Sequence, residues 1–165
     1  MSTAPKTDQI KFLKDKIEDV RIAMLVTVKE NHKMHSRPMG TAKVDDEGNI
    51  WFFTNEYSSK VDEISHDNKV VVTYSNPNNS TYLSINGTAS LVDDKEKMKE
   101  YWNPIIKAFF PDGIDDPKLT LMKVDTENAE YWDSNSSKMV LAFQMLKAVV
   151  TGERYDQGDH GKIEL

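Results

Sequence analysis

A lysine at the start of a predicted helix is the residue whose position most needs a chemical explanation. Residues 50–53 form a short apolar and aromatic run typical of a buried strand, and serines followed by acidic residues then mark a helix start. Lys60 falls at the positive end of that helix dipole, where a cation destabilises by roughly a few tenths of a kcal/mol. A phosphate held by Ser58, Ser59, Lys60 and free backbone N–H groups would remove the conflict. The alternative is a solvated lysine on an ordinary capped helix.

An arginine on an earlier predicted strand, residues 34–44, is a second candidate for binding an anion. Pro38 lacks an N–H group, so it belongs at a sheet edge or a bulge. Arg37 beside a bulge could direct its guanidinium at a ligand phosphate, although a surface arginine on an edge strand is the alternative. His32 and His35 have a ligand-like spacing, but a loop and a strand start share no helical face. We therefore expect no metal site there.

The composition of the 165-residue chain restricts its class. The length fits one domain, which we expect to span residues 1–165 with a core over about 8–150. A net charge of −6 argues against general nucleic-acid binding, which needs a basic face. The chain has no cysteine, which excludes disulfides and thiolate catalysis. Neither a signal peptide nor an apolar run of about 20 residues is present, so we expect a cytoplasmic protein that does not enter a membrane.

Hydrophobic periodicity and turn residues predict the elements that must position these side chains. Apolar residues at helical spacing predict a helix over 7–20 with Thr7 as its N-cap, and a second over 93–110 that breaks or kinks at Pro104. Strands are predicted over residues 22–28, 34–44, 50–53, 69–75, 81–92 and 121–124.

The segment 81–92 has two interpretations because Asn86-Gly87 lies at its centre. Asn-Gly is a strong hairpin signal, whereas the missing side chain of Gly87 also permits one long strand that kinks at a barrel corner. We favour the kinked strand, since either half alone would be very short.

The C-terminal part is predicted to be helical over 139–149, with Gly152 as the stop and a loose polar tail from 153 to 165. Six strands mostly joined by short turns, with helices at the ends and between them, predict a mainly β protein with appended helices. An antiparallel barrel is the architecture that fits this pattern.

Three stretches together resemble a known family. They are Ser36-Arg37-Pro38-Met39, Phe53-Thr54-Asn55 followed by Ser58-Ser59-Lys60, and Tyr131-Trp132. Over roughly residues 8–150 the chain resembles the FMN-binding split β-barrels of the pyridoxamine 5′-phosphate oxidase-like superfamily, and within it the general stress protein 26 branch. The Thr-Asn-x-x-Ser-x-Lys pattern is the most specific element. The resemblance implies a six-stranded antiparallel split β-barrel.

The resemblance also implies roles for individual residues. Arg37, on the Ser36–Met39 stretch, would clamp the FMN phosphate with its guanidinium, and Met39 would lie along the isoalloxazine edge. Phe53 and Thr54 match the pair that lines the flavin ring and the ribityl chain. The whole set implied to bind FMN is Ser36, Arg37, Pro38, Met39, Phe53, Thr54, Ser58, Ser59, Lys60, Tyr82 and Trp132.

Two members of that set bear on assembly. Tyr82 falls where the vitamin oxidases of the family carry a glutamine that contacts the ring, and Trp132 matches a tryptophan that packs at the flavin of the other subunit. The resemblance therefore implies a homodimer with two FMN sites across its interface. Lys138 occupies one position of the oxidases' basic substrate segment, but Ala142 replaces its second arginine. Pyridoxine-phosphate oxidation is accordingly not expected.

The implied function is that of an FMN-binding flavoprotein, a flavin-dependent oxidoreductase of the general stress protein type. No side chain stands out as acid, base or nucleophile, which suits chemistry supplied by the cofactor and leaves the small-molecule substrate and the electron donor open. Two alternatives are a flavin-binding stress protein without turnover and a split-barrel dimer that binds haem or a deazaflavin.

Overall fold

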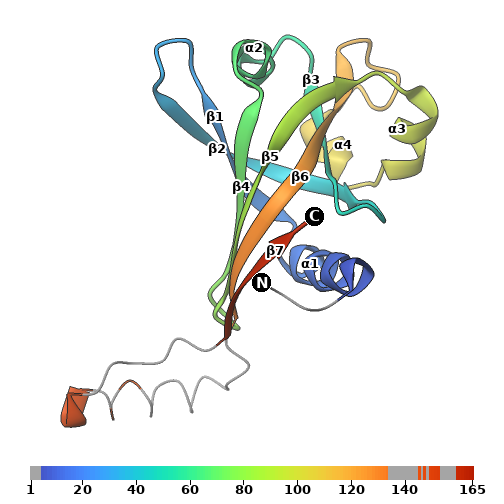
Figure 1. Cartoon of the computed structure of the whole chain (residues 1–165). Coiled ribbons are helices and arrows are strands. Elements are labelled where there is room, and N and C mark those ends of the chain that lie inside the picture. The colour runs from blue at the N-terminus through green and yellow to red at the C-terminus, as the bar shows by residue number, and fades with distance from the viewer. Residues whose placement is uncertain (1–4, 134–144, 146, 148, 153–158) are drawn as a thin grey trace.

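The computed structural model describes residues 5–133, 145, 147, 149–152 and 159–165 (Figure 1). Within these ranges the strands form one sheet that closes on itself, and short helices pack around it. No helix in these ranges is long and apolar enough to cross a membrane. The elements follow in the order α1 (Lys6–Val20), β1 (Ile22–Val28), β2 (Met34–Val44), β3 (Ile50–Asn55), α2 (Ser59–His66), β4 (Lys69–Asn76), β5 (Thr81–Val92), α3 (Lys95–Tyr101), α4 (Ile106–Phe109), β6 (Leu119–Asp133) and β7 (Asp159–Glu164).

All neighbouring strands pair antiparallel, in the order β3-β2-β1-β4-β5-β6-β7. A further pairing between β3 and the first half of β6 closes a six-stranded barrel. β7 lies outside this closure, because it pairs with residues 128–133 of β6, beyond the end of the β3 pairing. The predicted mainly β fold with appended helices, built on a six-stranded antiparallel barrel, is confirmed.

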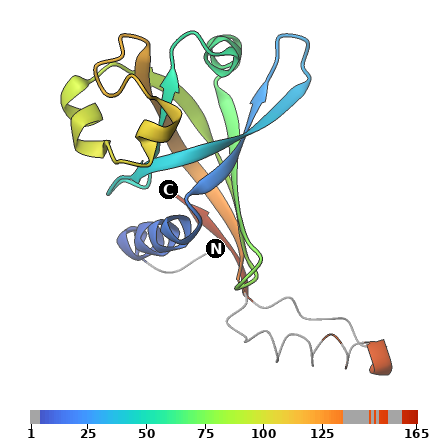
Figure 2. The same ribbon diagram turned by 180° about the vertical axis from the view of Figure 1, so that it is seen from behind.

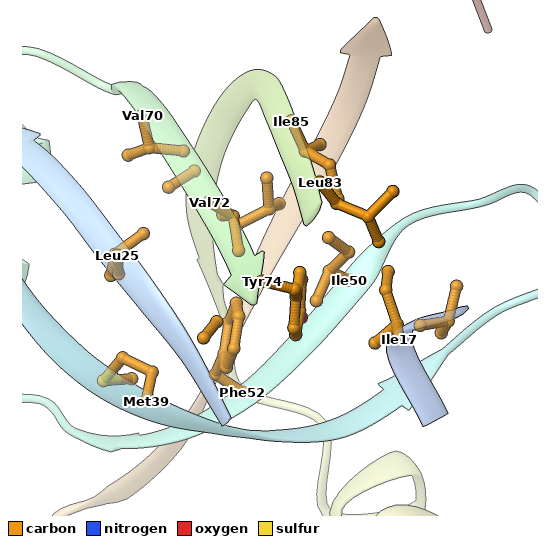
Figure 3. Packing of buried hydrophobic residues seen from close by; sticks show 14 of the residues in the cluster. Ile17, Leu25, Met39, Ile50, Phe52, Val70, Val72, Tyr74, Leu83 and Ile85 are labelled. Atoms are coloured by element: carbon orange, nitrogen blue, oxygen red, sulfur yellow. The ribbon is translucent and has the colours of Figure 1, made fainter. Parts of the chain in front are cut away.

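The barrel interior is filled by side chains that alternate inward along the strands. Phe52 and Tyr74 are the largest of them, and both are almost fully buried among aliphatic side chains of neighbouring strands (Figure 3). The Tyr74 hydroxyl lies 2.6 Å from Thr41 Oγ1, so the buried polar tip of the ring has a partner. Ile17 of α1 packs against this core, whereas α2 covers the opposite end of the barrel (Figures 1 and 2).

A proline precedes α1 and an aspartate precedes α3. The prediction that Thr7 caps the first helix is wrong, because α1 begins at Lys6 with Pro5 as its N-cap and no side-chain cap. The fixed φ of a proline is already close to the helical value, so it can begin a helix without a capping hydroxyl. Pro104 separates α3 from α4 as expected, and Asp94 caps α3 by accepting a bond from a backbone N–H of its first turn.

Gly87 lies within one continuous strand, as the kinked-strand interpretation predicted. β5 runs from Thr81 to Val92, and its register against β6 shifts between Asn86 and Gly87. A β-carbon at Gly87 would lie 2.3 Å from the backbone oxygen of Asp125 on β6. The absence of a side chain therefore permits the close approach of the two strands at this bulge.

Two expectations for the C-terminal part are wrong. β6 extends to Asp133 rather than ending at residue 124, because the acidic residues of its second half alternate with residues such as Ala129, which is buried in the barrel. The described part of the tail, residues 159–165, is not loose, because β7 pairs with β6 and buries Ile163 in the same core. An isolated Ile among polar residues and glycines gave too weak a pattern to predict a strand.

The predicted helix over 139–149 lies mostly outside the described residues, as do Lys138 and Ala142. Residues 149–151 are helical, and Gly152 follows them with a φ of 71°. Gly152 therefore occupies the left-handed conformation that commonly ends a helix, and its role as the stop is confirmed.

Replacing Gly87 with alanine should lower the free energy of unfolding by about 1–3 kcal/mol, because the new methyl group meets the Asp125 carbonyl rather than a flexible side chain. Urea unfolding followed by circular dichroism measures this change. Gly40→Ala on β2 is the matched control, since its β-carbon would meet only the Ile22 side chain, at 3.9 Å. Equal stability of the two variants would contradict the close approach.

Candidate functional site

The site is built around a place where two neighbouring strands separate. β2 and β3 pair from Val44–Ile50 to Thr41–Phe52, and no further. Beyond this point β2 remains paired with β1, and β3 remains paired with β6. Residues 38–40 of β2 and 53–55 of β3 therefore have no pairing with each other, and we call this gap the split. Backbone N–H and C=O groups at its two edges are available to a ligand.

A cavity of about 220 Å³ lies at the split. Five residues of the predicted cofactor set line it together: Pro38, Met39, Phe53, Thr54 and Lys60. Its other wall comes from the segment around α4, with Ile105, Ile106, Phe109 and Phe110. The ionisable side chains in this lining are Arg21 and Lys60, and no carboxylate is among them. An apolar cavity with two cations is suited to a ligand that combines an aromatic body with negative charge.

Lys60 is the second residue of α2 and is half-buried. Within the described ranges it has neither an ion pair nor a hydrogen bond. Burial lowers the pKa of its ammonium group, the nearby charge of Arg37 lowers it further, and Glu63 opposes these effects. The N-cap residue Ser58 makes no capping bond, and its hydroxyl lies 3.4 Å from Thr54 Oγ1. The helix start therefore retains free N–H groups beside a desolvated cation, as a phosphate site requires.

Arg37 has a partner within the chain that the sequence did not indicate. Its Nη2 forms an ion pair with the carboxylate of Glu63, and its Nη1 donates to Thr27 Oγ1 at 2.6 Å. His35 Nδ1 lies 2.6 Å from Arg37 Nη2 and 2.9 Å from Glu63 Oε1. Arg37 does not line the cavity, although it is close enough to Lys60 to affect its pKa. In this structure the arginine charge is thus neutralised by Glu63 rather than free for a phosphate.

Glu63 is a buried carboxylate held in its ionised form. Burial by itself raises the pKa of Glu63, but hydrogen bonds with Thr27, His35 and Arg37, together with the arginine charge, lower it to about 2. Glu63 lies one helical turn after Lys60, so α2 carries both the cation at the cavity and the anion that holds Arg37. Sequence spacing placed Glu63 on α2 but could not show which side chain from β2 it meets.

The remaining predicted residues lie away from the cavity. Ser36 is exposed on β2, and Ser59 lines a separate hollow between α2 and the β1–β2 turn. Tyr82 and Trp132 are register partners on β5 and β6, where Trp132 stacks on His160 of β7 at a centroid distance of 5.1 Å. Conversely, Arg21 and the α4 segment line the cavity, and neither was predicted to do so. Apolar residues next to Pro104 were the signal for α4.

The architecture and the site place the chain among known proteins. The family model described as pyridoxamine 5'-phosphate oxidase like matches residues 8–156, so the chain belongs to that family. A putative general stress protein 26 from Jannaschia sp. CCS1 superposes with a TM-score of 0.76 at 24% identity, covering 96% of this chain and 99% of that one. This structural similarity shows that the two chains share a fold.

Two further relatives are more similar in sequence. The general stress FMN/FAD binding protein from Xanthomonas citri is 29% identical, with a TM-score of 0.66 and coverage of 78% of this chain and 90% of that one. The protein bli-3 of Neurospora crassa is 28% identical over 127 residues, which are 72% of this chain but only 61% of that protein's length. The fold is thus that of general stress proteins in the oxidase-like family.

Glu63→Gln should lower the free energy of unfolding by about 3 kcal/mol at neutral pH, because it leaves the Arg37 charge buried without a counter-ion. The folded-state pKa of Glu63 is below its ordinary value of 4.5. Its stabilising contribution is therefore present above that value and lost as the pH falls from about 4.5 toward about 2.

Urea unfolding from neutral pH to about pH 3 tests this prediction, since the stabilities of wild type and variant should converge in acid. Asp62→Asn, on the exposed side of the same helix, is the control and should change stability by less than about 0.5 kcal/mol. A constant difference between wild type and Glu63→Gln at all pH values would contradict the role of the ionised carboxylate.

Proposed function

We propose that the split binds flavin mononucleotide and that the protein is a flavin-dependent oxidoreductase of the general stress protein type. The observation that carries the proposal is the half-buried ammonium of Lys60, which lines the cavity and has no counter-ion in the described part of the chain. A phosphate group attached to an aromatic body matches the lining. The phosphate meets Lys60 and the N–H groups that begin α2, and the apolar wall around α4 accommodates ring surface.

The strand edges at the split suit the polar atoms of a flavin ring. That ring carries carbonyl oxygens and an N–H group along one side, and the unpaired backbone of residues 38–40 and 53–55 offers complementary donors and acceptors. Gly40 has no side chain to obstruct this edge. When bound, the flavin supplies the hydride and electron chemistry, and the chain supplies binding and orientation.

Membership of the oxidase-like family and likeness to the FMN/FAD binding protein of Xanthomonas citri both support a flavin ligand. The phosphate site favours the mononucleotide, because one desolvated lysine at one helix start matches a single phosphate group. Arg37 acts on this phosphate site only indirectly, through its contact with α2. The ion pair of Arg37 with Glu63 fixes the position of that helix against β2.

A homodimer is part of the same proposal. Ile22, Met24 and Met34 are 50%, 41% and 76% exposed on the outer face of β1 and β2, which leaves an apolar sheet surface open to solvent. Tyr82 on β5 and Trp132 on β6 are register partners and do not line their own chain's cavity. Pairing of this face with a second copy would bury the apolar residues and bring Trp132 toward the partner's split.

Lys60→Ala should weaken FMN binding by about ten- to a hundredfold, because it removes one charge-assisted hydrogen bond to the phosphate. Riboflavin has the same ring but no phosphate, so its affinity should hardly change. Fluorescence titrations of both ligands with wild type and variant measure the difference. The stability of the apoprotein should hold or rise slightly, because the change removes a cation from the positive end of α2.

Lys69→Ala, which removes an exposed lysine at the start of β4, is the matched control and should leave both affinities unchanged. An equal loss of FMN and riboflavin in Lys60→Ala would show that Lys60 is structural. Absence of FMN binding by the wild type at micromolar concentrations would reject the proposed cofactor.

Met24→Asp should convert the proposed dimer to a monomer, because it buries an unpaired charge at the centre of an apolar contact. Sedimentation velocity measures the state of assembly. Leu91→Asp, at a residue of similar exposure near the far end of β5, is the control and should leave the dimer intact. A wild-type monomer that still binds FMN tightly would contradict a site shared between subunits.

A further inference from the structure

Lys60 differs from the other half-buried lysines in the described part of the chain. Each of the others has an acidic or aromatic partner: Lys14 with Asp46, Lys16 with Asp133, Lys97 with the ring of Trp51, and Lys123 with Asp125. Lys60 forms neither an ion pair nor a hydrogen bond within these ranges, and no carboxylate lines its cavity. A lysine that is partly removed from water without such a partner is destabilised in its charged form.

The surroundings of two half-buried lysines shift their pKa values in opposite directions. Burial lowers the pKa of Lys60, and the nearby charge of Arg37 lowers it further, while Glu63 opposes these effects. The hydrogen bond between Lys123 and Asp125 raises the pKa of Lys123. A lower pKa gives a larger fraction of neutral amine, and only the neutral amine has a lone pair that can attack a carbonyl carbon. Lys60 is therefore suited to react as a nucleophile.

The surroundings of Lys60 also favour one class of electrophile. Met39, Phe53 and Ile106 line the same cavity with apolar side chains that can accommodate a short acyl chain. Lys60 lies in the first turn of α2, whose N–H groups bind a phosphate in the function proposed above. An acyl phosphate combines the two groups, since its carbonyl carbon is the electrophile and its phosphate is the leaving group.

We propose that Lys60 is a site of acylation by small acyl phosphates and that this modification prevents FMN from binding. The neutral amine attacks the carbonyl carbon, and a C–N bond forms. The C–O bond to the phosphate breaks, and the phosphate leaves with the electron pair and takes up the proton that the nitrogen loses. The resulting amide is uncharged, so it no longer attracts the phosphate of the flavin. The choice of electrophile rests on the proposed function, whereas the reactivity of Lys60 does not.

Treatment of the full chain with acetyl phosphate at neutral pH, followed by peptide mass spectrometry, tests the proposal. Lys60 should be acetylated about tenfold faster than either Lys123, which is half-buried and ion-paired, or Lys69, which is exposed. Excess FMN should slow the reaction at Lys60 and leave the rate at Lys69 unchanged. The rate at Lys60 should also level off at a lower pH than the rate at Lys69, because its pKa is lowered. Equal rates at Lys60 and Lys69 would overturn the proposal.

Lys60→Arg separates the charge from the nucleophile, because a guanidinium group stays protonated and does not attack the reagent. Acetyl phosphate treatment should weaken FMN binding about ten- to a hundredfold in the wild type and hardly at all in Lys60→Arg. An equal loss in both proteins would show that other lysines are responsible and would overturn the regulation. Absence of FMN binding by the untreated wild type would reject the proposed function, whereas the acetylation rates would still decide whether Lys60 is the reactive lysine.

Discussion

The pairing of β2 with β3 stops at Thr41 and Phe52, and the arrangement of the site depends on this limit. A barrel whose strands pair along their full length leaves no backbone groups for a ligand. Here β2 remains paired with β1 and β3 remains paired with β6, so the barrel holds together while the edges of β2 and β3 separate. The gap needs a cover on its outer side, and the segment around α4 provides apolar side chains for it.

The three cations near the split have different surroundings, although the chain as a whole carries a net charge of −6. Arg37 is neutralised by Glu63 beneath α2, and the ion pair joins that helix to β2. Lys60 and Arg21, by contrast, line the cavity, and no carboxylate lines it with them. One cation thus stabilises the fold of the site, and two are available to a ligand.

Local patterns in the sequence were enough to predict the barrel strands apart from the second half of β6, the kink at Gly87 and the lysine at the helix start. Each of these predictions depends on residues that are close together in the chain. The strands follow from apolar alternation, the kink from the missing side chain of Gly87, and the lysine from its position relative to the helix dipole. The partner of Arg37 could not be predicted, because Glu63 and Arg37 are brought together only when α2 packs on the barrel. Arg21 was missed for a similar reason. Its place on the cavity wall follows from the path of β2, not from its own neighbours in the chain.

The turn at Gly48 ties together the two ends of the described chain. A β-carbon at Gly48, which has a φ of 88°, would lie 2.8 Å from Leu165 and 3.3 Å from Ile10 of α1. During synthesis the first helix and all six barrel strands are made before residues 159–165. The contacts that cover this corner of the barrel can therefore form only after β7 has been made, and they join segments more than a hundred residues apart.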